Sequence, residues 1–168
     1  MTIETRTVTE YRAQGRTLSG YAATFGTEAR IGSFSESIRA GAFSDSLSTG
    51  RDILALVDHD ATRVLGRTKT GTLKLVEDAR GLQFEIDVPD TAAGRDVLTM
   101  AERGDLGGMS FGFNVTDEHW TGERRELRAV DLREISVVNA WPAYAGTSID
   151  ARAARPRLAG LQRYLRTI

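Results

Sequence analysis

The sequence predicts an α+β domain, built on a curved antiparallel β-sheet or β-barrel with a few helices around it. Six or more short segments alternate between apolar and polar residues or form short apolar runs, and two or three others show helical spacing. The chain of 168 residues is long enough for one domain with a substantial core. With 40% apolar and 27% charged residues, it has the balance of an ordinary globular protein.

The first part of the chain predicts a strand pair, a loop and a short helix. Residues 8–25 carry apolar side chains on both sides of residues 14–16, which we interpret as a turn. Residues 26–41 contain several glycines and serines and predict a loop. Residues 42–47 predict a short helix that ends near Gly50.

Strand signals dominate the middle of the chain. Residues 52–59 contain a short apolar run bounded by charges, and its length favours a buried strand over a helix. Three further strands are predicted at residues 64–66, 72–76 and 82–88. Residues 77–81 have the length of a hairpin connection between the last two strands.

A helix is predicted between Thr91 and about Arg103. Asp90 or Thr91 can cap its N-terminus, and apolar residues recur on one side of the segment. Gly104 follows as a C-terminal stop.

The last residues form a separate, basic segment. Residues 151–168 contain five arginines and no acidic residue, so residues 1–150 carry 17 basic and 23 acidic groups and a net charge of −6. Apolar residues recur in this segment at helical spacing, at Leu158, Leu161, Leu165 and Ile168. We therefore expect a body at residues 1–150 and a basic amphipathic helix or tail at residues 151–168.

Composition excludes several classes of site. The chain has no cysteine and therefore no disulfide, thiolate zinc site, iron–sulfur cluster or cysteine nucleophile. With two histidines, it cannot form a site with a set of three histidine ligands. The sequence has neither the roughly 18 consecutive apolar residues of a membrane span nor the apolar core of a signal peptide. A net charge of −1 argues against a nucleic-acid-binding surface over the whole molecule.

Glu134 lies in a predicted long strand at residues 127–138, after a strand at residues 110–115 and a polar hairpin tip at residues 117–125. Because alternate residues of a strand share a face, Glu134 is expected on the more apolar face, with Val130, Leu132, Ser136 and Val138. Burying an ionised carboxylate without a partner costs several kcal/mol. Its partner is expected to be an arginine in an ordinary salt bridge, water at an open edge, or a group with a chemical role.

His59 is expected at the end of the apolar strand, on the face of Ile53, Ala55 and Val57. That position suits a group that exchanges protons, and it equally suits an ordinary strand-end histidine. Asp58 and Asp60 are expected on the opposite face and are poorer candidates than Glu134 to orient the imidazole. The tripeptide also allows a metal-dependent hydrolase, although it lacks further ligands at suitable spacing.

Ser110 is the candidate nucleophile. It lies between Gly107-Gly108-Met109 and Gly112, and such glycines let a substrate backbone approach closely and leave amides free to donate. A serine hydroxyl needs a base to become a nucleophile, and the base needs an orienting acid. His59, Ser110 and Glu134 supply one of each. A serine in a glycine-rich turn is the ordinary alternative, because triads are recognised by geometry and not by spacing.

Several motifs, in order along the chain, resemble those of the prohead proteases of tailed phages with the HK97-type capsid. The resemblance covers about residues 18–145. Its motifs are Gly20-Tyr21-Ala22-Ala23-Thr24-Phe25-Gly26, Arg39-Ala40-Gly41-Ala42-Phe43, Leu56-Val57-Asp58-His59-Asp60, Val64-Leu65-Gly66-Arg67-Thr68, Glu77-Asp78-Ala79-Arg80-Gly81-Leu82, Met109-Ser110-Phe111-Gly112-Phe113, Leu132-Arg133-Glu134-Ile135-Ser136-Val137-Val138 and Trp141-Pro142-Ala143-Tyr144. Ala40, Asp58 and Trp141 depart from the usual family residues and do not belong to the implied triad.

The resemblance implies a serine endopeptidase related in fold to the herpesvirus assembly proteases, a β-barrel ringed by helices. It implies His59 as the general base, Ser110 as the nucleophile and Glu134 as the third member of the triad. Two sets of backbone amides are candidates for the oxyanion hole, and the choice between them stays open. One set belongs to Gly107-Gly108-Met109, and the other belongs to residues 142–146, which include Ala143. No cofactor or metal is implied.

The resemblance further implies that the protease cuts the scaffolding segment from the major capsid protein, and then itself, inside the immature capsid in the bacterial host cytoplasm. A homo-oligomer is expected, without a membrane or a specific nucleic acid as partner. The basic tail is expected either to dock or dimerise, to be a self-cleavage region, or to pack on its own domain. The alternative is a catalytically silent capsid-assembly or scaffolding module of the same fold.

Overall fold

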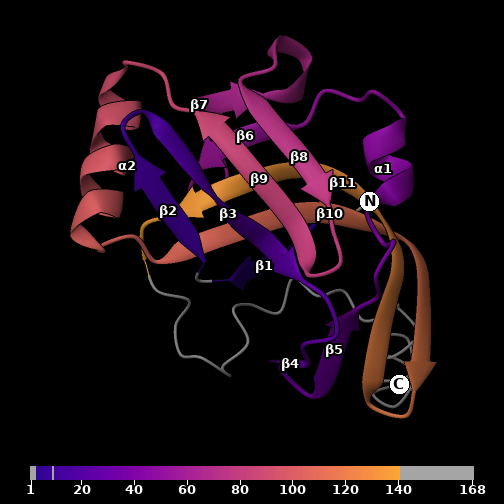
Figure 1. Ribbon diagram of the computed structural model, residues 1–168. Helices are drawn as coiled ribbons and strands as arrows, with labels where there is room; N and C mark the ends of the chain where they lie inside the picture. The colour runs from indigo at the N-terminus through magenta and orange to yellow at the C-terminus, as the bar shows by residue number, and fades with distance from the viewer. Residues whose placement is uncertain (1–2, 9, 141–168) are drawn as a thin grey trace, which may run out of the picture.

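The computed structural model of the protein describes residues 3–8 and 10–140, which form two β-sheets and a few short helical elements (Figure 1). The elements in chain order are β1 (Glu4–Val8), β2 (Tyr11–Gln14), β3 (Thr17–Thr24), β4 (Ala29–Ile31), β5 (Phe34–Ile38), α1 (Ser44–Ser48), β6 (Leu54–Val57), β7 (Asp60–Arg67), the 3₁₀ helix η1 (Thr68–Thr70), β8 (Leu73–Glu77), β9 (Gly81–Asp87), α2 (Ala92–Arg103), β10 (Gly108–Thr121) and β11 (Arg124–Val138). The tail at residues 151–168 lies outside the described residues, so the division into body and tail stays a prediction.

The larger sheet has seven strands and is organised around β11. One edge of β11 pairs antiparallel with β10, and β1 pairs antiparallel with the other edge of β10. The opposite edge of β11 pairs in parallel with β5 near the start of β11 and with β6 near its end. β4 and β7 then form antiparallel hairpins with β5 and β6. The long strand β11 therefore lies between β6 and β10 and places them on its two edges.

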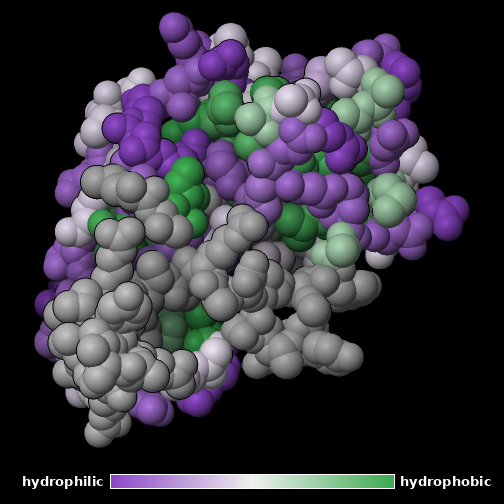
Figure 2. All heavy atoms as spheres, turned by 180° about the vertical axis from the view of Figure 1, so that it is seen from behind, coloured by the Kyte–Doolittle hydropathy of each residue, from purple (hydrophilic) through white to green (hydrophobic). Residues whose placement is uncertain are grey.

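The smaller sheet has four antiparallel strands in the order β2-β3-β9-β8, and its apolar face contributes to one core with the larger sheet. Leu18 and Phe84 from the smaller sheet belong to the same buried cluster as Phe111 and Ile135 from the larger one. In the view of Figure 2, the described surface is mostly hydrophilic, and hydrophobic groups show only in small areas. Among the described residues, no helix has the length and apolar character needed to cross a membrane.

The described strands do not close into the expected antiparallel barrel. The parallel pairs of β11 with β5 and β6 make the larger sheet mixed. β1, β4 and β7 are edges of this sheet, and β2 and β8 are edges of the smaller one. A closed barrel needs every strand paired on both sides, so these strands form two open sheets instead. The predicted α+β class agrees with the structure, and the barrel prediction does not.

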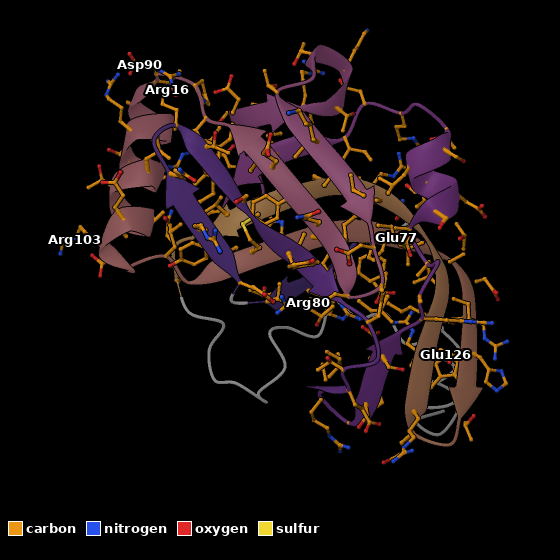
Figure 3. The ribbon with its side chains drawn as sticks, in the orientation of Figure 1. Arg16, Glu77, Arg80, Asp90, Arg103 and Glu126 are labelled. Atoms are coloured by element: carbon orange, nitrogen blue, oxygen red, sulfur yellow. The ribbon has the colours of Figure 1, made fainter. Side chains whose placement is uncertain are left out.

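Both predicted helices of the body are present. Thr91 caps α2 by accepting a hydrogen bond from the amide of Gly94 at 3.1 Å, and Gly104 ends the helix at φ 75°. Val97 is buried on the inner side of α2, which packs beside β2 (Figure 1). Asp90 and Arg103 lie at the two ends of the helix on its outer side (Figure 3). α1 agrees with the helix predicted at residues 42–47.

The loop predicted at residues 26–41 is wrong, because this segment contains the hairpin of β4 and β5. On β5, the buried residues are Phe34 and Glu36, so a charged side chain occupies an inward position. The alternation of apolar and polar residues that would predict a strand is therefore interrupted at Glu36. The hairpin and the distal parts of β10 and β11 project together away from the smaller sheet (Figure 1).

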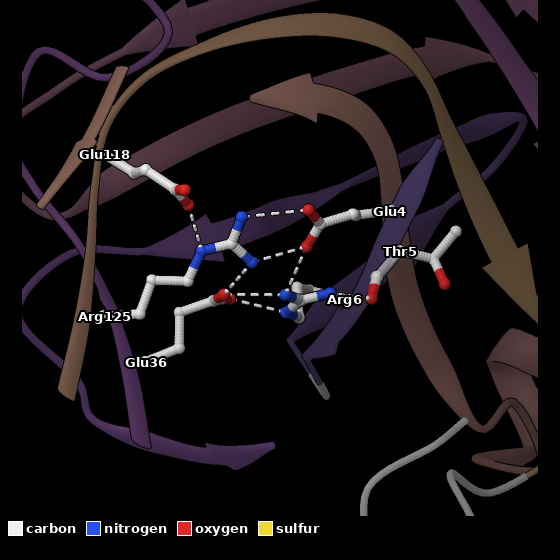
Figure 4. A network of polar contacts seen from close by, with 6 residues as sticks. All are labelled: Glu4, Thr5, Arg6, Glu36, Glu118 and Arg125. Carbon is white, nitrogen blue, oxygen red and sulfur yellow. Dashed lines mark hydrogen bonds and ion pairs between the residues drawn. The ribbon is translucent and has the colours of Figure 1, made fainter. Parts of the chain in front are cut away.

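Glu36 is buried because it belongs to a network of charged side chains that joins four strands (Figure 4). Arg125 on β11 contacts Glu4 on β1 at 2.7 Å, Glu36 at 3.1 Å and Glu118 on β10 at 2.6 Å. Arg6 on β1 contacts Glu4 at 2.9 Å and Glu36 at 2.5 Å. The network connects the N-terminal strand with the projecting hairpins, and it fixes β1 along β10.

Candidate active site

A tight turn between β6 and β7 carries His59. The expected strand to residue 59 is wrong, because β6 ends at Val57, and Asp58 and His59 form the turn. Both have left-handed backbone conformations, at φ 50° and 60°. This is the conformation of the two-residue turns that fit the twist of a β-hairpin, although glycine or asparagine is the usual occupant. Each such residue costs of the order of 1–3 kcal/mol, so the surroundings must hold the turn in place.

Hydrogen bonds from β11 and its end hold this turn. The amide of Asp58 donates to the carbonyl of Val137 at 2.8 Å. The carboxylate of Asp58 accepts from the backbone amide of Asn139 at 2.9 Å and from its side-chain amide at 2.7 Å. Asp60 instead accepts from Thr62 at 2.6 Å. The two carboxylates beside the histidine therefore have different partners, and among the described residues no group of three or more potential ligands could hold a metal ion.

His59 is paired with Glu134. Its Nδ1 lies 2.6 Å from Oε1 of Glu134, and the two side chains are 32% and 12% exposed. An ionised carboxylate only accepts hydrogen bonds, so Nδ1 carries the proton and donates it. The other ring nitrogen, Nε2, is then the one that can accept a proton. Of the partners left open for the Glu134 carboxylate, the structure shows a histidine and not the neighbouring Arg133, which pairs with Asp131 at 2.9 Å.

A β-bulge places Glu134 on the side of the site. Leu132 is opposite Phe113, but Glu134 is opposite Gly112, so Arg133 is an extra residue in β11. The bulge reverses the faces of the strand: Leu132 is in the core before it and Ile135 after it. The expectation that Glu134 shares a face with Leu132 is therefore wrong. Glu134 lies opposite the core face, where the turn of His59 can contact it.

Gly112 leaves the space that the carboxylate of Glu134 occupies. A Cβ atom at Gly112 would overlap Oε1 of Glu134 and would also approach its Cδ. The sequence suggested that this glycine admits a substrate backbone. The structure gives it a second role, because it lets a charged side chain from β11 lie against β10.

We expect the substitution Gly112→Ala to disturb the His59–Glu134 pair. The added methyl group must displace the carboxylate oxygen that faces Nδ1, so we expect a loss of catalytic rate of at least about tenfold, since a displacement of about 1 Å can cost 100-fold. The measurement is the rate of Ser110 labelling by a fluorophosphonate probe, with unfolding followed by circular dichroism. A labelling rate equal to that of the wild type would show that displacing the Glu134 carboxylate does not affect the reactivity of Ser110.

Ser110 lies beside this pair on β10. It is opposite Ser136 on β11, and directly opposite residues of an antiparallel pair have Cβ atoms about 4.5–5.5 Å apart. Ser136 in turn accepts a hydrogen bond from the amide of His59 at 3.2 Å. Ser110 is fully buried, and its Oγ makes no hydrogen bond. The histidine–carboxylate bond is thus formed, Ser110 lies opposite the serine that contacts both of its members, and Ser110 makes no hydrogen bond to His59.

Three of the predicted oxyanion donors, Gly107, Gly108 and Met109, directly precede Ser110 in the chain. The amide of Gly107 donates to the carbonyl of Val138 at 2.8 Å and is therefore used by the fold. Gly108 and Met109 lie in β10, in register with Val138 and Val137. Ala143 lies outside the described residues. The choice between these candidates stays a prediction.

Sequence reasoning gave no role to two residues that contact the site. Ser136 contacts both Glu134 and His59, and Asn139 holds Asp58. For Ser136, a signal was present, because it follows Glu134 by two positions on the same strand. Asn139 gave no such signal, because its contact with Asp58 depends on the turn.

Comparison with known proteins identifies the family of the chain. Neither the curated proteins nor the solved structures gave a significant match. The family model described as the caudovirus prohead serine protease matches residues 1–159. This match covers the turn of His59, Ser110 on β10 and Glu134 on β11. The chain belongs to the caudovirus prohead serine protease family, a family of hydrolases that act in capsid maturation.

Proposed function

We propose that the protein is a serine endopeptidase that cuts the scaffolding segment from the major capsid protein during prohead maturation. In this proposal Ser110 is the nucleophile, His59 is the general base and Glu134 orients the base. The observation that carries the proposal is the 2.6 Å contact between Nδ1 of His59 and Glu134, next to a serine hydroxyl without a hydrogen-bond partner. Family membership supports the reaction class.

The reaction begins when the Ser110 side chain turns toward Nε2 of His59. As Oγ attacks the scissile carbonyl carbon, its proton moves to Nε2, and Glu134 stabilises the imidazolium that forms. The imidazolium then donates this proton to the leaving amine, and the peptide bond breaks. Water next attacks the acyl-enzyme with His59 again as the base, which releases the new carboxylate and restores Ser110.

The same proposal gives the protein a place and partners. It acts inside the immature capsid in the host cytoplasm, on the capsid protein and on its own chain, and it works there as a homo-oligomer. Amides of the segment that contains Gly108 and Met109, or of the segment that contains Ala143, stabilise the oxyanion. Cleavage after assembly makes maturation irreversible, because the bond that held the scaffolding segment is not re-formed.

The test combines a chemical probe with the natural substrate. The purified protein is treated with a fluorophosphonate, and the labelled peptide is identified by mass spectrometry. In parallel, the chain is co-expressed with the major capsid protein of the same phage, and the mass of the capsid subunit is measured. We expect the label on Ser110 and a shortened capsid subunit. Without label and without shortening, the silent assembly module would be the better account.

We expect the substitution Glu134→Gln to slow the reaction less than His59→Ala does. The amide keeps the shape of the side chain, but it can hold the imidazole in the wrong tautomer and cannot stabilise an imidazolium. A fall approaching about 10⁴-fold in rate is the precedent for the aspartate of a serine protease triad. Capsid processing and Ser110 labelling measure both variants. If Glu134→Gln is as active as the wild type, Glu134 has only a structural role.

A further inference from the structure

We propose that Ser136 is a positioning residue that holds both halves of the His59–Glu134 pair. This inference rests on the proposed function and adds a residue to its machinery. The Oγ atom of Ser136 donates to Oε2 of Glu134 at 2.6 Å and accepts from the backbone amide of His59 at 3.2 Å. One buried hydroxyl therefore contacts the carboxylate and the turn that carries the imidazole.

The contact with the carboxylate determines which oxygen faces the histidine. A carboxylate held by one hydrogen bond can rotate about its Cγ–Cδ bond. Because Ser136 occupies Oε2 at 2.6 Å, Oε1 stays directed at Nδ1 of His59, also at 2.6 Å. Gly112 provides the space on the other side of this group. The carboxylate is thus held by Ser136 of β11 and by His59 of the turn, and Gly112 of β10 leaves the space it occupies.

The contact with the backbone acts on the histidine itself. His59 has a left-handed backbone at φ 60°, which is unfavourable for a residue with a side chain. Its amide would point at β11 without a partner if Ser136 had no hydroxyl. The hydrogen bond that this amide donates to Ser136 therefore stabilises the turn conformation that directs the imidazole toward Glu134.

The same contacts explain why Ser110, and not Ser136, is left for chemistry. The two serines are opposite each other on β10 and β11, and both are fully buried. A hydroxyl has a single proton to donate, and Ser136 donates its proton to Glu134. The Oγ of Ser110 makes no hydrogen bond and keeps its proton available for transfer to a base. The fold therefore gives different roles to two serines that lie opposite each other on neighbouring strands: Ser136 positions Glu134, and Ser110 is left to react.

The test compares Ser136→Ala with Ser46→Ala. Ser46 is a matched control, because it is also buried and its hydroxyl also accepts a backbone amide, that of Leu132 on β11 at 2.8 Å. The rate of Ser110 labelling by a fluorophosphonate is measured for each variant, together with the low-field proton resonance of Nδ1 of His59. We expect Ser136→Ala to label about 10–100-fold more slowly and to shift or lose this resonance. Ser46→Ala should leave both unchanged.

If Ser136→Ala does not fold, Ser136→Cys replaces it, because a thiol has similar shape and is a weak donor. The same loss of labelling is expected from it. Labelling at the wild-type rate in the Ser136 variants, or an equal loss in Ser46→Ala, would overturn the positioning role. The wild type is measured first, so a failure of the proposed function appears as absence of wild-type labelling and is distinct from both outcomes.

Discussion

Replacing Ser110 by alanine is expected to abolish capsid processing without loss of stability. Removal of a triad nucleophile typically lowers the rate by about 10⁴–10⁶-fold. The fold should be unaffected, because the hydroxyl of Ser110 is buried and makes no hydrogen bond that the substitution could break. A buried hydroxyl without a partner is itself unfavourable, so the unfolding free energy should stay equal or rise slightly. Co-expression with the capsid protein and thermal unfolding provide the two measurements.

The opposite pattern is expected of a serine with a structural role. Ser46 holds the amide of Leu132, so Ser46→Ala should lower the unfolding free energy by about 1–3 kcal/mol and leave processing intact. The two substitutions remove the same atom from buried sites, and they differ in which property they affect. Normal processing by Ser110→Ala would contradict the serine-protease mechanism.

The sequence predicts those elements whose signals are local. The helix α2 is recognised because the capping residue Thr91 and the terminating glycine Gly104 are next to it in the chain, and both act as predicted. The hairpin of β8 and β9 is found for a similar reason, since alternation and a short polar connection occur together. Such features need no knowledge of distant residues.

The missed elements depend on contacts between distant residues. β1 and β5 were not predicted, because Glu4 and Glu36 occupy buried positions that a hydrophobic pattern assigns to apolar residues. They are buried because Arg125, far along the chain, contacts both. Likewise, the face of Glu134 could not be read by alternation, because the bulge at Arg133 changes the periodicity of β11. The chain offers no local signal for either arrangement.

At the site, the residue types were predictable and their arrangement was not. The sequence indicated that Glu134 needs a partner and that His59 needs an orienting acid, and the structure joins the two. The role of Ser136 required the register of β10 and β11 and the turn that directs the amide of His59 toward β11. Chemistry therefore suggested the participants, whereas the topology of the larger sheet determines how they meet.

The second large effect is expected from Arg125→Met, which removes the central cation of the buried network. Glu4 and Glu36 are 5% and 3% exposed, and among the described residues Arg6 would be their remaining cationic partner. Removal of one partner from a buried ion pair typically costs about 3–5 kcal/mol, out of a total stability of about 5–15 kcal/mol. β1 should then separate from β10, where Thr7 lies opposite Ser110, so labelling of Ser110 should also fall.

Urea unfolding at pH 7 and pH 4 tests this origin of the loss, with Arg124→Met as the control. Arg124 is the neighbouring residue, is 76% exposed and contacts Glu28 at 3.4 Å, so its loss should change the stability by less than about 1 kcal/mol.

In the wild type, burial alone would raise the pKa of Glu4, but the hydrogen bonds and charges of Arg125 and Arg6 outweigh it and hold the pKa below its usual value. The ionised Glu4 therefore stabilises the wild type at neutral pH, and this contribution is lost as the pH falls through the lowered pKa. In Arg125→Met, the effect of burial prevails and the carboxyl gains stability from protonation. The difference in unfolding free energy between the wild type and Arg125→Met should therefore be smaller at pH 4 than at pH 7. An equal difference at both pH values would show that the loss of stability comes from packing and not from uncompensated charge.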